Sequence, residues 1–476
     1  MIDSRINNIR TNSPKTSSEA NTNIPEELAG IKNQVCLHSD SSSVLEATAC
    51  FCLFTYIFLN PFSHITSAKE IFLYGGFSAF LLALIKKELS IAEIQKVPLI
   101  KVFLLFTVWA FLGLFSSIDV SNSVHDFYSY LLRYLILYVI LVFVLQKEKR
   151  IELLGKLIVV SVFMISVYLM YKHFISDGKS IHMKLRTDLP EMPVNWVGFL
   201  LVFAVTLAVK FIFDPGVKKN KIMVRFFMVL ALAVFFLVTV ITQSRATTIS
   251  VCFVFLAGFF FRSWKNGVVL LVLVLMIFFF SPVKKRFNPS GIFGDVRVGL
   301  LFSSIKIVQE YPIFGLGYGF KCFANTDLDN LKKKFPDLYE KLVPNRFKKL
   351  IVTGKSRRVI QFGDPHNIFS SVAVRTGVIG GLFFVAVLGA FWRNTWRLAQ
   401  DNCSEFHRFY GVTILSAFSG VLFIAIMEPV GNHLFHTVFF TLLGMGSALS
   451  MHRNFAVRPN VEGNYVQPIQ SCGSNP

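Results

Sequence analysis

Runs of about 20 apolar residues recur along this chain, and they limit its possible folds more than any other feature. A helix of this length spans the hydrocarbon core of a bilayer, which is roughly 30 Å thick. Hydrophobic residues make up 53% of the 476 positions. The sequence therefore predicts an integral membrane protein with about twelve transmembrane helices. The expected spans are residues 44–62, 70–85, 97–117, 127–146, 154–175, 193–213, 222–243, 246–262, 266–281, 367–391, 408–427 and 431–450.

The predicted fold class is all-α. Inside a bilayer every backbone polar group needs a partner within the protein, and a helix satisfies this requirement in one segment. A membrane β-barrel would require alternating segments of about ten residues, which the sequence lacks. We expect a polar cytoplasmic tail that is disordered, helices 1–9, a partly helical periplasmic loop, helices 10–12 and a second cytoplasmic tail. These parts are residues 1–43, 44–281, 282–365, 366–450 and 451–476, respectively.

The net charge of +20 sets the orientation of the helices and does not indicate nucleic-acid binding. Lysine and arginine gather in alternate short loops, such as residues 86–96, 147–150 and 218–225. Short basic loops stay in the cytoplasm, so we expect both termini there. The loop of residues 282–365 is basic too, but loops longer than about 60 residues escape this rule. We place this loop outside the cytoplasm.

The long loop has apolar patterning that predicts a folded cap over the outer membrane face. Residues 295–310 read as a helix, and Tyr311-Pro312 ends it because proline cannot continue the backbone hydrogen bonds. Residues 311–319, called the glycine turn below, follow with the sequence Tyr-Pro-Ile-Phe-Gly-Leu-Gly-Tyr-Gly. No strand–helix–strand unit surrounds these glycines, which argues against nucleotide binding and for a tight turn with close backbone approach.

Arg245 lies between the seventh and eighth expected spans, where a charged side chain is costly unless it has a function. A guanidinium group carries a rigid fork of donors that matches phosphate oxygens. Gln243 and Ser244 add hydrogen-bonding groups beside it. These residues predict an anion-binding site. The alternative interpretation is a side chain that extends to the interface and only marks it.

His366 follows Asp364 and Pro365 just before the tenth expected span. Aspartate favours a helix N-cap and proline the first helical position, so we expect His366 in the first helical turn. The helix dipole disfavours an imidazolium there, and a neutral imidazole can act as a general base. The alternative is an interfacial histidine that satisfies a neighbouring group.

Other polar residues leave alternatives open. Arg297 and Lys321 flank the glycine turn and are either further phosphate contacts or solvated surface. Glu428 and His433, near the outer ends of the last two spans, either orient a sugar or cap helices. The histidines and cysteines show no metal-ligand spacing, so we expect no metal and no cofactor.

Three motifs occur in a fixed order: Gln243-Ser-Arg-Ala, the glycine turn, and Pro365-His-Asn-Ile-Phe followed by Arg375-Thr-Gly377. This set resembles the O-antigen ligase and O-antigen polymerase superfamily of bacterial envelopes. The resemblance implies an inverting, metal-independent glycosyltransferase in the inner membrane, with its active site facing the periplasm. It implies His366 as general base and Arg245 as diphosphate contact. Arg297 is our choice for a second phosphate contact, and Asn367 joins the substrate-binding residues.

The implied donor is a glycan on undecaprenyl diphosphate. The acceptor is a lipid A–core sugar in a ligase of lipopolysaccharide biosynthesis, or another lipid-linked glycan in a polymerase. The long basic loop favours a phosphorylated acceptor and therefore the ligase. A transporter of lipid-linked glycans is the alternative from another class, although the internal repeats of many transporters are absent. Membrane lipids are expected partners, and nucleic acids are not.

Overall fold

The computed structural model describes residues 43–86, 88, 91–181, 183, 185, 194–213, 222–260, 296–324, 364–401 and 404–456. The chain divides into two compact units, Met1–Val44 and Leu45–Pro476, and the helices belong to the second from Leu45 onward. The predicted span 266–281, most of the loop 282–365 and most of both predicted tails lie outside the described residues.

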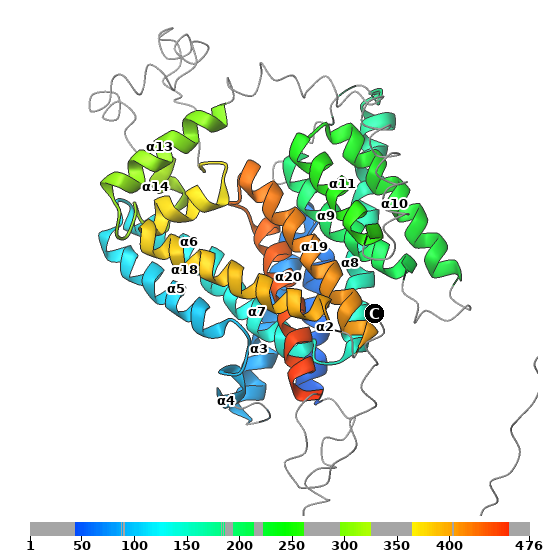
Figure 1. Cartoon of the computed structure of the whole chain (residues 1–476), viewed down its shortest axis with the longest axis horizontal. Helices are drawn as coiled ribbons and strands as arrows, with labels where there is room; N and C mark the ends of the chain where they lie inside the picture. The colour runs from blue at the N-terminus through cyan, green and yellow to red at the C-terminus, as the bar shows by residue number, and fades with distance from the viewer. Residues whose placement is uncertain are drawn as a thin grey trace, which may run out of the picture. The chain divides into compact units, whose positions relative to one another are not determined.

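The described part of the chain is helical and contains no strand, which confirms the predicted all-α class (Figure 1). Each predicted span other than 266–281 coincides with an apolar helix. The first helices are α2 (Val44–Leu59), α3 (Thr66–Ile85), α4 (Ile91–Ile94), α5 (Ile100–Leu112), α6 (Val120–Asp126), α7 (Arg133–Val144), α8 (Glu148–Tyr171) and α9 (Val194–Phe213). The others are α10 (Ile222–Thr242), α11 (Arg245–Phe260), α13 (Val296–Glu310), α14 (Phe320–Ala324), α18 (Ile368–Ala399), α19 (Glu405–Met427) and α20 (His433–Ala456).

Eight helical segments in the described residues are long and apolar enough to cross a membrane, and three shorter apolar helices accompany them. A π-helical segment, Phe127–Leu132, joins α6 to α7 and makes them one continuous span. The protein is therefore an all-α membrane protein, while the predicted number of twelve spans remains a prediction.

Helices α9 and α20 form the centre of the bundle. α9 packs against α8, α10, α11, α19 and α20, and α20 also packs against α7 and α18. Aromatic rings lie in the contact between them, where Phe435 of α20 meets Phe199 of α9, and Phe435 also stacks on Phe439 of its own helix. Because lipid tails are as apolar as these side chains, tight packing rather than water exclusion holds such helices together. Peripheral helices instead expose apolar residues, such as Met223 and Phe226 on α10, as expected of lipid-facing surfaces.

Contacts along α9 give the directions of its neighbours. Gly198, near the start of α9, lies against Thr247 in the first turn of α11. Lys210, near the end of α9, lines one cavity with Arg408 in the first turn of α19. The start of α11 therefore lies at the end of the bundle where α19 finishes.

The start of α18 lies at this same end, because the Asn367 side-chain amide donates to the carbonyl oxygen of Ile426, 3.2 Å away, in the last turn of α19. We call it the His366 end. The opposite end, called the His452 end, holds the start of α8, the start of α19 and the last turns of α20. The candidate residues of α11 and α18 thus share one end of the bundle.

Single-cysteine labelling tests the predicted orientation. In a protein whose seven native cysteines are replaced, cysteines at Gly178 and Lys321, both exposed at the His366 end, should react with an impermeant maleimide in intact spheroplasts. Cysteines at Glu88 and Gln146 should react only after permeabilisation, because basic loops stay inside. Labelling of position 321 only after permeabilisation would show that the orientation is the opposite of the predicted one.

Candidate functional site

A strained turn joins α10 to α11 and places Arg245 at a helix start. Gln243 is buried and has a left-handed backbone, with φ +49°. The Ser244 hydroxyl oxygen accepts a hydrogen bond from the Thr247 N–H, 3.4 Å away, and so caps α11. Arg245, predicted between two spans, is the first residue of α11 and is half-buried. The free N–H groups of a first helical turn favour anions. The guanidinium and the helix start therefore both favour binding of an anion here.

The predicted cap of α18 is wrong. Asn367, not Asp364, is the N-cap: its side-chain oxygen accepts from the N–H groups of Phe369 (2.9 Å) and Ser370 (3.1 Å), and α18 begins at Ile368. The amide group of Asn367 also donates to the carbonyl oxygen of Ile426, so this side chain ties the start of α18 to α19, a contact that an aspartate cannot make.

His366 therefore lies in a loop before the helix and not in its first turn. Its backbone is left-handed, with φ +58°. Such backbones cost on the order of 1–3 kcal/mol in non-glycine residues and often occur at functional sites. The prediction that the helix dipole disfavours an imidazolium at His366 therefore no longer follows from the position of this residue.

Asp364 fixes this loop. One carboxylate oxygen accepts from the His366 N–H, 2.8 Å away, and the other accepts from the Ser371 hydroxyl, 3.0 Å away. Burial raises the pKa of Asp364, and the positive charge of Arg375 opposes this rise. The carboxylate thus ties the His366 loop to the first turns of α18.

Arg375 is a buried cation that the sequence analysis named only as part of a motif. Its guanidinium carbon lies 3.1 Å from the Phe320 ring centroid and 5.4 Å from that of Tyr318. Among the described residues, its Nη2 atom has no hydrogen-bond partner. A charged group in the apolar core marks a functional site by default. The sequence signal that could have identified Arg375 is its position as an arginine inside an expected transmembrane span.

The glycine turn docks against a break in α18. The Leu316 N–H donates to the carbonyl oxygen of Val374 and the Val378 N–H to that of Pro312, both at 2.8 Å. Gly377 breaks the helix with φ +71° and ψ −175°, and a Cβ atom there would overlap the backbone of the turn. This confirms the predicted close backbone approach.

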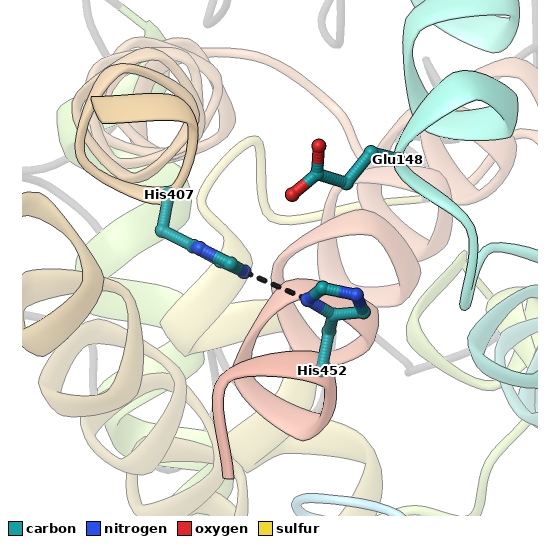
Figure 2. A group of neighbouring side chains, drawn as sticks. All are labelled: Glu148, His407 and His452. Carbon is teal, nitrogen blue, oxygen red and sulfur yellow. Dashed lines mark hydrogen bonds between the residues drawn. The ribbon is translucent and has the colours of Figure 1, made fainter. Parts of the chain in front are cut away.

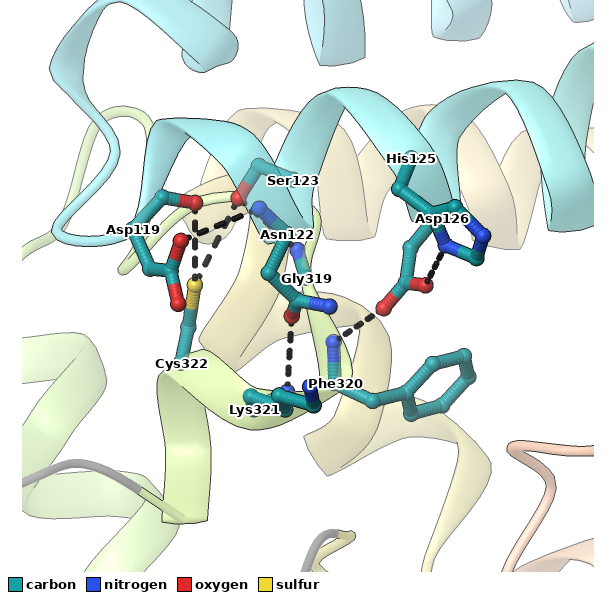
Figure 3. A network of polar contacts seen from close by, with 9 residues as sticks. All are labelled: Asp119, Asn122, Ser123, His125, Asp126, Gly319, Phe320, Lys321 and Cys322. Carbon is teal, nitrogen blue, oxygen red and sulfur yellow. Dashed lines mark hydrogen bonds and ion pairs between the residues drawn. The ribbon is translucent and has the colours of Figure 1, made fainter.

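Helix α6 holds the other side of the glycine turn, as Figure 3 shows. Side chains of α6 accept hydrogen bonds from three successive backbone N–H groups at the start of α14. Ser123 accepts from Gly319 (3.0 Å), Asp126 from Phe320 (2.7 Å) and Asn122 from Lys321 (2.9 Å). The turn therefore bridges α6 and α18, and Phe320 reaches Arg375 from this position.

Aromatic and imidazole rings pack beside Phe320. Tyr130 stacks on His433 with ring centroids 4.6 Å apart and meets Phe320 edge-on at 4.9 Å. Asn432, and not His433, caps α20 by accepting from the Phe435 N–H at 2.7 Å. The capping alternative for His433 is thus excluded, and its role in binding a sugar stays a prediction.

Glu428, the other residue for which capping was considered, is buried at the C-terminal cap of α19. Lys321 is exposed on α14, in keeping with its solvated alternative. Arg297 belongs to the first turn of α13, which packs against α18, but its side chain lies outside the described residues. Tertiary structure therefore gathers Gln243, Ser244, Arg245, His366 and Asn367 at one end of the bundle and leaves the contacts of Arg297 open.

Residues 226–385 match the family model described as O-antigen ligase. This match supports a place for the chain in the O-antigen ligase superfamily. Members of this family are membrane ligases or polymerases that resemble glycosyltransferases, with lipid-linked glycans and membrane lipids as partners. The matched stretch contains Arg245, the glycine turn, His366 and Arg375. A search of curated proteins found no match to the chain.

Two glycine substitutions test the docking of the turn. Gly317 has φ +109°, and a Cβ atom there would overlap the hydroxyl groups of Ser117 and Ser123. Gly317→Ala should destabilise the protein by at least about 1–2 kcal/mol, the cost of a left-handed alanine. Gly389→Ala on α18 is the control, because its Cβ would meet no atom within 4 Å. Thermal unfolding in detergent measures both, and equal midpoints would contradict the docking model.

Proposed function

We propose that this protein is an O-antigen ligase that transfers a glycan from undecaprenyl diphosphate to a sugar hydroxyl of lipid A–core at the periplasmic face of the inner membrane. One observation carries the proposal. The strained His366 loop and the arginine at the start of α11 lie at the same end of the bundle, within the stretch that matches the family. A base and a phosphate-binding group are the two functions that such a transfer needs.

Arg245 is proposed to bind the diphosphate of the donor. The leaving diphosphate gains negative charge as its bond to the sugar breaks, and a fixed cation stabilises that charge. Ser244 uses an oxygen lone pair to cap α11, so its hydroxyl hydrogen remains able to donate to a phosphate oxygen. Gln243 is proposed as a further hydrogen-bond partner of the diphosphate. Arg297, in the first turn of α13, is the proposed second arginine contact to the diphosphate.

His366 is the proposed general base. It takes the proton of the acceptor hydroxyl as that oxygen attacks the anomeric carbon, while the bond from this carbon to the diphosphate oxygen breaks and the diphosphate leaves with the electron pair. Attack from the opposite face inverts the anomeric centre. The nearby Asp364 carboxylate stabilises the imidazolium that forms.

Asn367 is a positioning residue in this mechanism. Its oxygen caps α18 and its amide group binds α19, so both groups are used within the protein. It fixes the backbone that presents His366. The membrane holds both lipid substrates near this end and orients them, which lowers the entropic cost of their encounter.

A polymerase is the second candidate, because the family includes both activities. The residues would do the same chemistry, and only the acceptor would change to a lipid-linked glycan. Purified protein in liposomes, given a lipid-linked donor and either acceptor, decides between them by the product formed. Movement of the donor across the bilayer without bond formation would instead indicate a transporter.

Arg245→Lys should slow transfer although the charge is kept. Lysine cannot reproduce a two-point contact with phosphate, and a charge-assisted hydrogen bond contributes about 1.5–3 kcal/mol. This corresponds to roughly a 10- to 150-fold loss in kcat/KM for the donor. Arg393→Lys, at an exposed arginine further along α18, is the control and should keep full activity. Equal rates for the two variants would mean that Arg245 only marks the interface.

His366→Asn should reduce the transfer rate by about 10²–10⁴-fold, the usual effect of removing a general base. Asparagine tolerates the left-handed backbone of this position, so the loop should keep its shape. Donor binding, measured by equilibrium dialysis, should persist. His64→Asn, at an exposed histidine, serves as the control. Substantial transfer by purified His366→Asn protein would show that the histidine is structural.

A further inference from the structure

Two histidines and a glutamate lie close together, as Figure 2 shows. They belong to the His452 end, at the opposite end of the helices from the proposed transfer site. Glu148 is the first residue of α8, His407 lies in the first turn of α19, and His452 lies near the end of α20. Their nitrogen and carboxylate oxygen atoms all lie within 4.8 Å of one another. Each residue comes from a different helix, so only the tertiary structure brings them together.

The geometry fits a metal ion better than a simple contact between rings. His407 Nε2 and His452 Nδ1 face each other at 3.1 Å. Two nitrogens bound tetrahedrally to zinc at about 2.0–2.1 Å lie roughly 3.3 Å apart, close to this separation. A hydrogen bond between the rings would explain the distance between the two nitrogens but not the carboxylate beside them.

The charges nearby favour the same interpretation. Glu148 makes no ion pair with any described residue, although its carboxylate approaches both imidazoles. The neighbouring Arg453 is paired with Asp401 at 3.0 Å, which limits its repulsion of a cation. His407 is buried, whereas Glu148 is exposed and His452 half-buried, so an ion could enter from the solvent side.

We propose that Glu148, His407 and His452 bind one divalent ion of the zinc class, with water in the fourth position. Two imidazole nitrogens and one carboxylate oxygen form a ligand set typical of zinc, and three protein ligands leave one position open. The ion links the start of α8 to α19 and α20. The spacing of histidines and cysteines in the sequence predicted no metal. This cluster was outside the reach of that argument, because its ligands come from three helices that are distant in the chain.

Metal binding to the intact, detergent-purified protein tests the proposal after removal of the affinity tag and of bound metal. The protein should bind one Zn²⁺ per chain by mass spectrometry of the dialysed sample. Co²⁺ should give the visible absorption of a tetrahedral nitrogen–oxygen site. Zn²⁺ should also raise the temperature of thermal unfolding, because it binds only the folded arrangement.

His407→Ala and His452→Ala should each weaken Zn²⁺ binding by at least about 100-fold. Even the loss of a group that only hydrogen-bonds to a metal ligand lowers metal affinity by about 10- to 100-fold. Glu148→Gln, which keeps one carbonyl oxygen, should weaken binding less. The exposed His64→Ala is the matched control and should bind Zn²⁺ normally. Undiminished stoichiometry in the His407→Ala/His452→Ala double variant would overturn the proposal. So would wild-type protein that binds neither Zn²⁺ nor Co²⁺ stoichiometrically, whatever the variants do.

Discussion

The contact between the glycine turn and the break in α18 is the interaction on which the site depends. A break in a membrane helix frees backbone groups that have no water to bind, so other parts of the protein must satisfy them. The turn does this through two backbone hydrogen bonds, from Val378 to Pro312 and from Leu316 to Val374. Each side thus satisfies a backbone group of the other.

This contact joins the extramembrane segment to the chemistry proposed for the bundle. It places Phe320 over the guanidinium of Arg375, whose charge in turn acts on Asp364. Asp364 binds the backbone of His366. The turn is therefore connected to the proposed base by a cation–π contact, a charge interaction and a hydrogen bond.

The sequence alone determined the features that follow from local composition. Continuous apolar segments predicted the helices, since length and hydropathy decide whether a segment can cross a bilayer. The helix before the glycine turn and its end at Tyr311-Pro312 followed from periodicity and from the missing proline N–H, and α13 ends at Glu310. The order of motifs around Arg245 and His366 indicated the superfamily that the family match then confirmed.

The tertiary structure decided whatever depends on residues distant in the chain. Asp364 and Asn367 are both good caps by residue type, and only the folded structure shows that Asn367 is the cap and that it also binds the end of α19. Gly377 reads as an ordinary small residue in a helix until the glycine turn lies against it. The cluster at His407 joins helices from three separate parts of the chain. Periodicity reports which face of a helix is apolar, but not which helix packs there, so these pairings required the folded bundle.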